Sequence, residues 1–243
     1  MIKFFRQIRK NLMEQNKTSR YFKYAIGEIV LVVIGILIAL QVNNWNENRT
    51  LEHTQTRYLK QLATDIDSMG FQYKGIVKYT KANHLIALGV YSNLKSCEIS
   101  DDQKINLDQL LITYNELGKL FQIRDTYEEM LSANLLAGIE DKQLKSIITE
   151  FFAQRDAMML YINDYQRDLS MDYQVIKDHV VFGFDTMNQP TVEYEVSKLC
   201  QSPDFINAIV EVTRKRENLY RMTQILSQKL EQMHSMQLQK AYD

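Results

Sequence analysis

One carboxylate stands inside an otherwise apolar run. Glu28 lies near the start of residues 24–42, and every residue from 29 to 40 is apolar or glycine. A carboxylate at membrane depth is costly, so it marks a functional contact by default. On a helix Glu28 shares a face with Gly35 and roughly with Ala39, where small side chains let a second helix approach closely. The sequence therefore predicts an intramembrane contact of these three residues with a partner helix.

A second interpretation of Glu28 stays open. The residue lies only about one turn inside the predicted membrane boundary, where its carboxyl group could be protonated or could meet lysine and arginine head groups. The spacing Gly35-x-x-x-Ala39 is by itself a weak signal for dimers, because pairs of small residues are common in membrane helices.

The two cysteines, Cys97 and Cys200, both fall at predicted helix ends. In an oxidising compartment they could pair and close a loop of about a hundred residues. Two unrelated thiols are the alternative, and the spacing alone does not choose between the two interpretations.

Residue types that carry catalysis or bind metals are not grouped in this sequence. The histidines are scattered, with no pair at helical spacing and no C-x-x-C motif, so no zinc site is expected; they are His53, His84, His179 and His234. The acidic pairs at 101–102 and 128–129 stand at predicted helix starts, where they meet the helix dipole favourably. We therefore expect no enzyme, no metal and no cofactor, while a hydrophobic ligand cleft between helices stays open.

Charge divides the chain into three parts. Residues 1–23 carry seven basic side chains and one acidic one, residues 24–42 carry only Glu28, and residues 43–243 carry 22 basic and 28 acidic side chains. Lysine and arginine stay preferentially on the cytoplasmic side, so we expect the amino terminus inside and the acidic body outside the inner membrane. Nucleic acid is a poor partner for this arrangement, because the basic part sits against a membrane and the body is acidic.

The basic arm is also amphipathic. Its cations alternate with aromatic and aliphatic side chains: Lys3, Arg6, Arg9 and Lys10 stand with Phe4, Phe5, Ile8 and Leu12. Such a segment is expected to lie on the anionic inner leaflet of the membrane. The alternative is that the arm serves only as a signal for topology.

The apolar run has the length of a membrane-spanning helix. Residues 24–42 rise about 28 Å as a helix, against about 30 Å for the hydrocarbon core of a bilayer. Aromatic residues flank the run, with Tyr21, Phe22 and Tyr24 before it and Trp45 after it, as at membrane interfaces. A cleaved signal peptide is the alternative, but no A-x-A site follows the run, which favours a retained anchor.

Glycine and proline are scarce, with 8 and 2 residues out of 243. Neither residue fits the interior of a long helix, so the shortage predicts an all-α fold. We expect a single N-terminal transmembrane helix that continues into a periplasmic helical bundle. The predicted divisions are a cytoplasmic arm over 1–23, a transmembrane helix over 24–44 and a periplasmic domain over 45–243.

Within the body, helices are expected at about 45–94, 101–117, 125–136, 141–181, 191–200 and 203–241. An amphipathic stripe marks the first of them, formed by Leu51, Tyr58, Leu62, Ile66, Met69, Tyr73 and Ile76. Capping boxes are expected for Ser100 with Gln103 and for Thr126 with Glu129. The Ser-Pro pair at 202–203 is typical of a helix start.

Several stretches together resemble a known family. Residues 24–41, YAIGEIVLVVIGILIALQ, and the following NNWNE at 43–47 resemble the opening of a domain-of-unknown-function family of single-pass proteins common in Bacteroidota. Such proteins usually begin with MIKFFR, as this chain does. Residues 126–136 resemble the family's T-Y-E-E-L-x-S-S-G-x-L stretch, with Ala133-Asn134 in place of Ser-Gly, and residues 144–152 resemble its L-x-x-x-I-x-x-Y-Y pattern. The resemblance implies a Gram-negative inner membrane and a periplasmic body, and it implies no activity.

We expect a membrane-anchored helical scaffold or interaction subunit of an envelope complex. Its partners would be the lipid bilayer and either another membrane protein or a second copy of the chain. The alternative is a periplasmic ligand-sensing domain that works with a separate signalling or transport subunit, because 23 cytoplasmic residues are too few to fold an output domain. An enzyme is disfavoured, since no acid, base and nucleophile are recognisable together.

Overall fold

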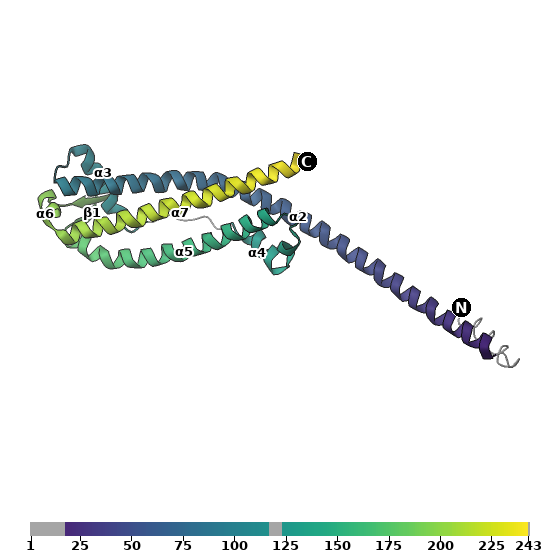
Figure 1. Cartoon of the computed structure of the whole chain (residues 1–243). Helices are drawn as coiled ribbons and strands as arrows, with labels where there is room; N and C mark the ends of the chain where they lie inside the picture. Colours follow the sequence, from purple (N-terminus) through teal and green to yellow (C-terminus); the bar gives the residue numbers. More distant parts are fainter. Residues whose placement is uncertain (1–17, 117–122, 243) are drawn as a thin grey trace. The chain divides into compact units, whose positions relative to one another are not determined.

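The computed structural model describes residues 18–116 and 123–242 (Figure 1). The chain divides into two compact units, residues 1–57 and 58–243. Helix α2, Thr18–Ser96, contributes residues to both units. The predicted helix ending at about residue 94 is thereby confirmed.

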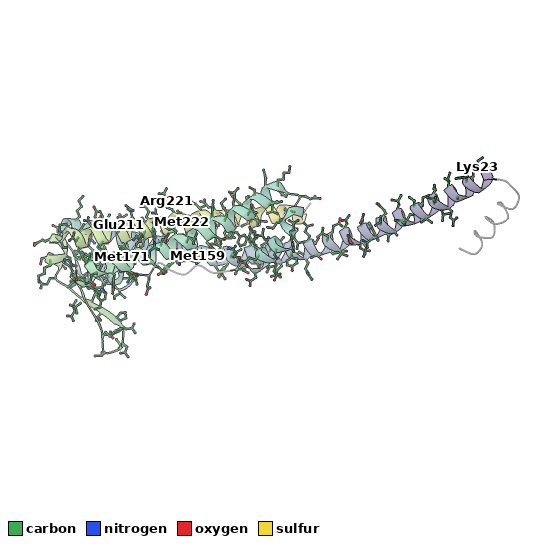
Figure 2. All side chains as sticks on the ribbon, turned by 90° about the horizontal axis from the view of Figure 1, so that it is seen from below. Lys23, Met159, Met171, Glu211, Arg221 and Met222 are labelled. Carbon is green, nitrogen blue, oxygen red and sulfur yellow. A yellow bond between two sulfur atoms is a disulfide. The ribbon has the colours of Figure 1, made fainter. Side chains whose placement is uncertain are left out.

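The first unit consists, in its described part, of the amino-terminal portion of α2. Every side chain from Ile29 to Thr50 is exposed, and the side chains along the helix beyond Lys23 point outward (Figure 2). Among the described residues, α2 is the one helix that is long and apolar enough to cross a membrane, and none of its most apolar window is buried within the chain.

The second unit is a helical bundle. The remainder of α2, helix α5 (Lys142–Lys177) and helix α7 (Pro203–Tyr242) run side by side (Figure 1). Three shorter helices complete it, namely α3 (Asp101–Ile112), α4 (Asp125–Ser132) and α6 (Val196–Gln201), with a 3-10 turn η1 at Leu135–Gly138. The expectation of a mostly helical protein is confirmed.

The core of the bundle follows from the amphipathic pattern of the long helices. On α2 the predicted stripe is buried in its central part, with Leu62, Ile66, Met69 and Tyr73 each 1% exposed or less. Tyr73 meets Phe151 of α5 edge to face, with ring centroids 6.1 Å apart. Burying large apolar side chains on one face of each helix is the main favourable contribution to such a bundle.

Two of the predicted helix starts are confirmed in detail. The Ser100 hydroxyl accepts a hydrogen bond from the Gln103 backbone, while the Gln103 side chain accepts one from the Ser100 backbone at 2.8 Å. At the start of α7 the Ser202 hydroxyl accepts a bond from the backbone nitrogen of Phe205 at 3.3 Å. Each cap satisfies a backbone donor that the helix leaves unpaired.

The predicted capping box of Thr126 and Glu129 is wrong. Helix α4 begins at Asp125, as expected, but its N-cap is Arg124 and no side chain caps it. Thr126 is instead buried inside the helix, where packing outweighs the local capping preference. The helix also ends at Ser132 rather than at residue 136, because Asn134 adopts a left-handed conformation with φ of 55°. Helix α3 ends at Ile112, short of the predicted residue 117.

The expectation of an all-α chain is wrong over residues 181–193. Strands β1 (Val181–Phe184) and β2 (Pro190–Glu193) form an antiparallel hairpin there, so the helix predicted over 191–200 begins only at Val196. Asp185 organises the turn, because its carboxylate accepts hydrogen bonds from the backbone nitrogens of Met187 and Gln189, both at 2.8 Å. An aspartate that bonds to the backbone just after it competes effectively with helix formation.

Replacing Phe151 by alanine should lower the free energy of unfolding by about 3–5 kcal/mol, because Phe151 is fully buried and the cavity would not collapse completely. The control is Phe184→Ala, which removes the same side chain from a position 75% exposed and should change stability by less than about 0.5 kcal/mol. Urea titration of the full chain in mild detergent, followed by far-ultraviolet circular dichroism, measures both values. Equal effects of the two substitutions would contradict the assigned core.

Candidate functional site

The three predicted intramembrane residues lie together on α2. Gly35 and Ala39 follow Glu28 by seven and eleven residues, which leaves all three on one side of the helix. Gly35 and Ala39 are exposed, and a Cβ atom added at Gly35 would meet nothing within 4 Å. The structure thus presents a face that a second helix could approach, and the contact itself stays a prediction.

The flanks of the apolar segment are only partly described. Phe22 and Trp45 are 65% and 61% exposed, and the guanidinium of Arg49 lies 5.7 Å from the centre of the Trp45 ring. An indole with a cation beside it suits the interface between lipid and water. The basic arm of Lys3, Arg6, Arg9 and Lys10 lies outside the described residues.

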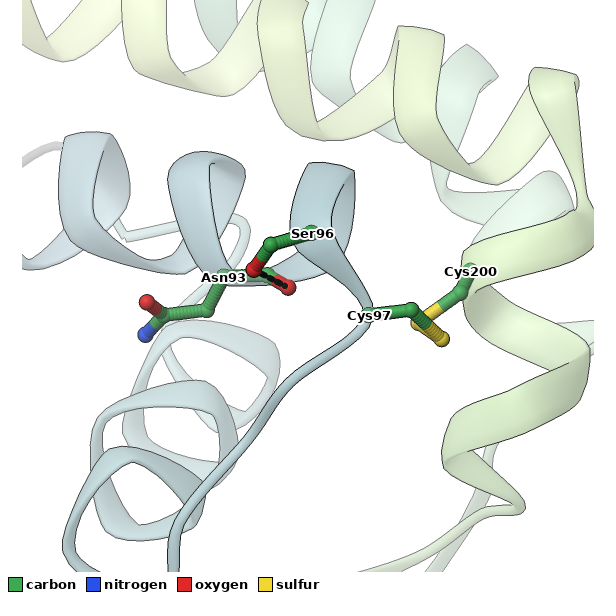
Figure 3. Close-up of a disulfide and its surroundings, with 4 residues drawn as sticks. All are labelled: Asn93, Ser96, Cys97 and Cys200. Carbon is green, nitrogen blue, oxygen red and sulfur yellow. Dashed lines mark hydrogen bonds between the residues drawn. A yellow bond between two sulfur atoms is a disulfide. The ribbon is translucent and has the colours of Figure 1, made fainter.

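The two cysteines are joined in the structure. Cys97 follows the last residue of α2, Cys200 lies on α6, and their Cα atoms are 5.6 Å apart (Figure 3). Cys97 has a φ of 54°, so the chain leaves α2 through a left-handed residue that turns its side chain toward α6. The bond closes a loop with a sequence separation of 103 residues, across α3, α4, α5 and the hairpin.

Removing this bond should destabilise the bundle. Replacing Cys97 and Cys200 together by alanine should lower the free energy of unfolding by about 2–5 kcal/mol, because a long loop in the unfolded chain is no longer closed. Treating the unchanged protein with a reductant should reproduce the loss, and the double variant should not respond to the reductant. Thiol titration of the denatured, unreduced protein checks the premise, and two free thiols would contradict it.

A group of charged residues, of which Arg155 is buried and the others are partly or largely exposed, joins the start of α4 to α5. The guanidinium of Arg124 bonds to the Asp156 carboxylate and also lies 2.5 Å from the Glu128 carboxylate. Arg155, only 3% exposed, approaches the same Asp156 at 3.6 Å. Burial raises the pKa of Tyr73, which lies beside Arg155, to about 12, so this hydroxyl stays protonated at neutral pH. The ion pairs of Arg124 with Asp156 and Glu128 therefore hold the start of α4 against α5.

The same place brings together the two body stretches that carry the family resemblance. The ring of Tyr127, from the first stretch, stacks on Phe152, from the second, with centroids 3.9 Å apart. Phe152 also meets Phe151 edge to face at 5.1 Å. These sequence features therefore build one packed junction between α4 and α5.

The Asp156→Asn substitution should lower the free energy of unfolding by about 1–2 kcal/mol, because two arginines lose their shared carboxylate while Arg155 stays buried. Asp164→Asn is the matched control on the same helix. It removes an exposed pair with Arg167, where the change should be below about 0.5 kcal/mol. Urea titration compares the two variants. An Asp156 effect no larger than that of Asp164 would show that the pairing of Asp156 with Arg124 and Arg155 contributes nothing to stability.

Arg216 was not anticipated from the sequence, and it links three helices. Its guanidinium donates to the backbone oxygen of Thr113 at 2.8 Å and to the Thr113 hydroxyl at 3.1 Å. It also reaches the backbone oxygen of Asn83 on α2 at 3.5 Å. Burial lowers the pKa of Arg216 to about 10. The sequence signal that could have identified Arg216 is its position between Val212 and Leu219, which places a basic residue on the apolar face of the last helix.

An open groove of about 400 Å³ lies between α2 and α7. Its lining combines apolar and charged side chains: Ile66, Asp67, Gly70, Phe71, Lys74, Leu230, Glu231 and His234. His234 Nδ1 lies 2.6 Å from Asp67 Oδ1, but no serine, threonine or cysteine stands among these lining residues to act as a nucleophile. In the described part of the chain, no three His, Cys, Asp or Glu side chains are grouped to hold a metal ion.

The comparisons with known proteins place the chain in a family. Neither the search of curated proteins nor that of solved structures found a match. The model of DUF6090, a family of unknown function, matches residues 28–217, more than three quarters of the chain. The expected membership of a domain-of-unknown-function family is thereby confirmed. The chain belongs to the DUF6090 family.

Proposed function

We propose that the protein is a membrane-anchored helical interaction subunit of an envelope complex. The exposed apolar surface of α2 between Ile29 and Leu40 carries this proposal. Water would cover that surface at a cost of about 25 cal/mol for each Å², whereas lipid chains cover it without that cost. The helix satisfies its own backbone donors and acceptors, as a spanning segment must.

Two independent features support an orientation with the body in the periplasm. Residues 1–23 carry a net charge of +6 and residues 43–243 one of −6, and basic residues favour the cytoplasmic side. The bond between Cys97 and Cys200 fits an oxidising compartment such as the periplasm.

An interaction role is favoured by the surfaces that the helices expose. Glu28, Gly35 and Ala39 offer a polar group beside small residues at membrane depth, which is the pattern of helix association in lipid. The bundle adds large apolar side chains in solvent, among them Phe71, Leu160 and Met171, which are 83%, 69% and 73% exposed. Single exposed apolar side chains occur on most proteins, so the residues at membrane depth are the stronger of the two arguments.

A ligand-sensing role is the second candidate, and the groove between α2 and α7 favours it. The volume of about 400 Å³ is in the range of small-molecule sites. The sensor would act with a separate signalling or transport subunit. Thermal unfolding of the full chain in the presence of periplasmic metabolites tests this role, and the absence of any stabilising compound would count against it.

The interaction role predicts that the full chain leaves native membranes in a complex larger than the monomer when extracted in mild detergent. Glu28→Leu should weaken that complex about 3- to 30-fold, because an interhelical hydrogen bond in lipid is worth about 0.6–2 kcal/mol. Glu52→Leu makes the same change at an exposed position of α2 beyond the apolar run and should leave the complex intact. Size-exclusion chromatography measures the size of the complex, and mass spectrometry identifies the proteins bound in it. A wild-type monomer with nothing bound would contradict the proposal.

A further inference from the structure

The outward face of α2 in the bundle carries a regular seam. Seven exposed residues follow one another at alternating steps of four and three: Phe71, Gly75, Lys78, Ala82, Leu85, Gly89 and Ser92. We call this set the α2 seam. Alternating steps of three and four are the spacing at which one helix packs along another in a coiled coil.

Packing within the bundle does not require the glycines of the α2 seam. Gly75 and Gly89 lie in the interior of a helix, where glycine is less stable than alanine. A Cβ atom added at either position would meet nothing within 4 Å, so the chain's own packing does not require them. With Ala82 they make every second seam position small, which lets the backbone of another helix come close.

Larger apolar side chains border these small residues. Phe71 and Leu85 in the seam are 83% and 54% exposed, and Leu88 and Tyr79 on its two sides are 44% and 46% exposed. Small residues between large ones form the holes and knobs that a packing helix needs.

The positive charge on and beside the α2 seam favours an acidic partner. Lys74, Lys78 and Lys81 are exposed here, and the ion pairs between described residues involve none of them. Two copies of the chain joined in parallel through this seam would bring one Lys78 against the other, which is unfavourable. An acidic helix would meet three unpaired ammonium groups instead.

We propose that the α2 seam seats an acidic amphipathic helix of a partner protein. The backbone of the partner helix packs on the small residues Gly75, Ala82 and Gly89, and its carboxylates pair with Lys74, Lys78 and Lys81. The inference deepens the proposed interaction role, on which it rests, by naming the surface and the charge of the partner.

A photo-crosslinking amino acid at Leu88 of the full chain, in native membranes, tests the seam. The matched control is Ile225 on α7, which is 48% exposed against 44% for Leu88. A covalent adduct should form at 88 and be at least tenfold weaker at 225, and peptide mapping should find an Asp- or Glu-rich helical segment in it. K74E/K78E/K81E should abolish the adduct, whereas K74R/K78R/K81R should retain it.

Two kinds of substitution at the seam glycines distinguish a lost contact with the partner helix from a loss of folding. G75L/G89L should reduce the adduct at least tenfold, whereas G75A/G89A, whose new Cβ atoms meet open space, should raise the melting temperature by roughly 2–4 °C. No adduct at 88, an adduct with a second copy of the chain, or an adduct indifferent to both glycine and lysine variants would overturn the inference. If the detergent complex persists in G75L/G89L, only the seam fails, whereas a wild-type monomer overturns the interaction role itself.

Discussion

An apolar helix surface must be covered by something other than water, and this requirement governs the amino-terminal part of the protein. From Ile29 to Leu40 the helix exposes aliphatic side chains around its whole circumference. A single helix packed on one face would cover only part of that circumference, whereas lipid covers all of it. The proposed orientation, which follows from the charges of residues 1–23 and 43–243, and the proposed contact of Glu28 both depend on this requirement.

In the bundle the apolar surface is covered by other helices, because each long helix has one apolar face and that face packs against the core. Leu62, Ile66 and Met69 were expected on that face and are buried. The capping box at Ser100 was also predictable, since a cap depends on residues three positions apart. Thr126 shows the limit of such local signals: its side chain is buried by α4 packing, and this contact outweighs its preference for a capping position.

The features that sequence reasoning missed depend on contacts between distant residues. Each strand of the hairpin at 181–193 has only four residues, too few to show a period, and Asp185 forms the turn through bonds to its own neighbours. Arg216 is stabilised by Thr113 and Asn83, more than a hundred positions away. For Cys97 and Cys200 the sequence left pairing open, and the fold brings them together because α2 ends where α6 lies. The intramembrane residues Glu28, Gly35 and Ala39 stay a prediction, since their partner would be another chain.

A reporter at the carboxyl terminus tests the central claim most directly, because all of the proposed roles require the apolar segment to cross lipid once. Fusions of the full chain to alkaline phosphatase and to green fluorescent protein should give opposite results in bacterial cells, with the phosphatase active and the fluorescent protein dark. The account predicts that the phosphatase fusion stays in the membrane fraction after carbonate washing. A fluorescent carboxyl terminus, or a mature protein that begins beyond Trp45, would contradict it.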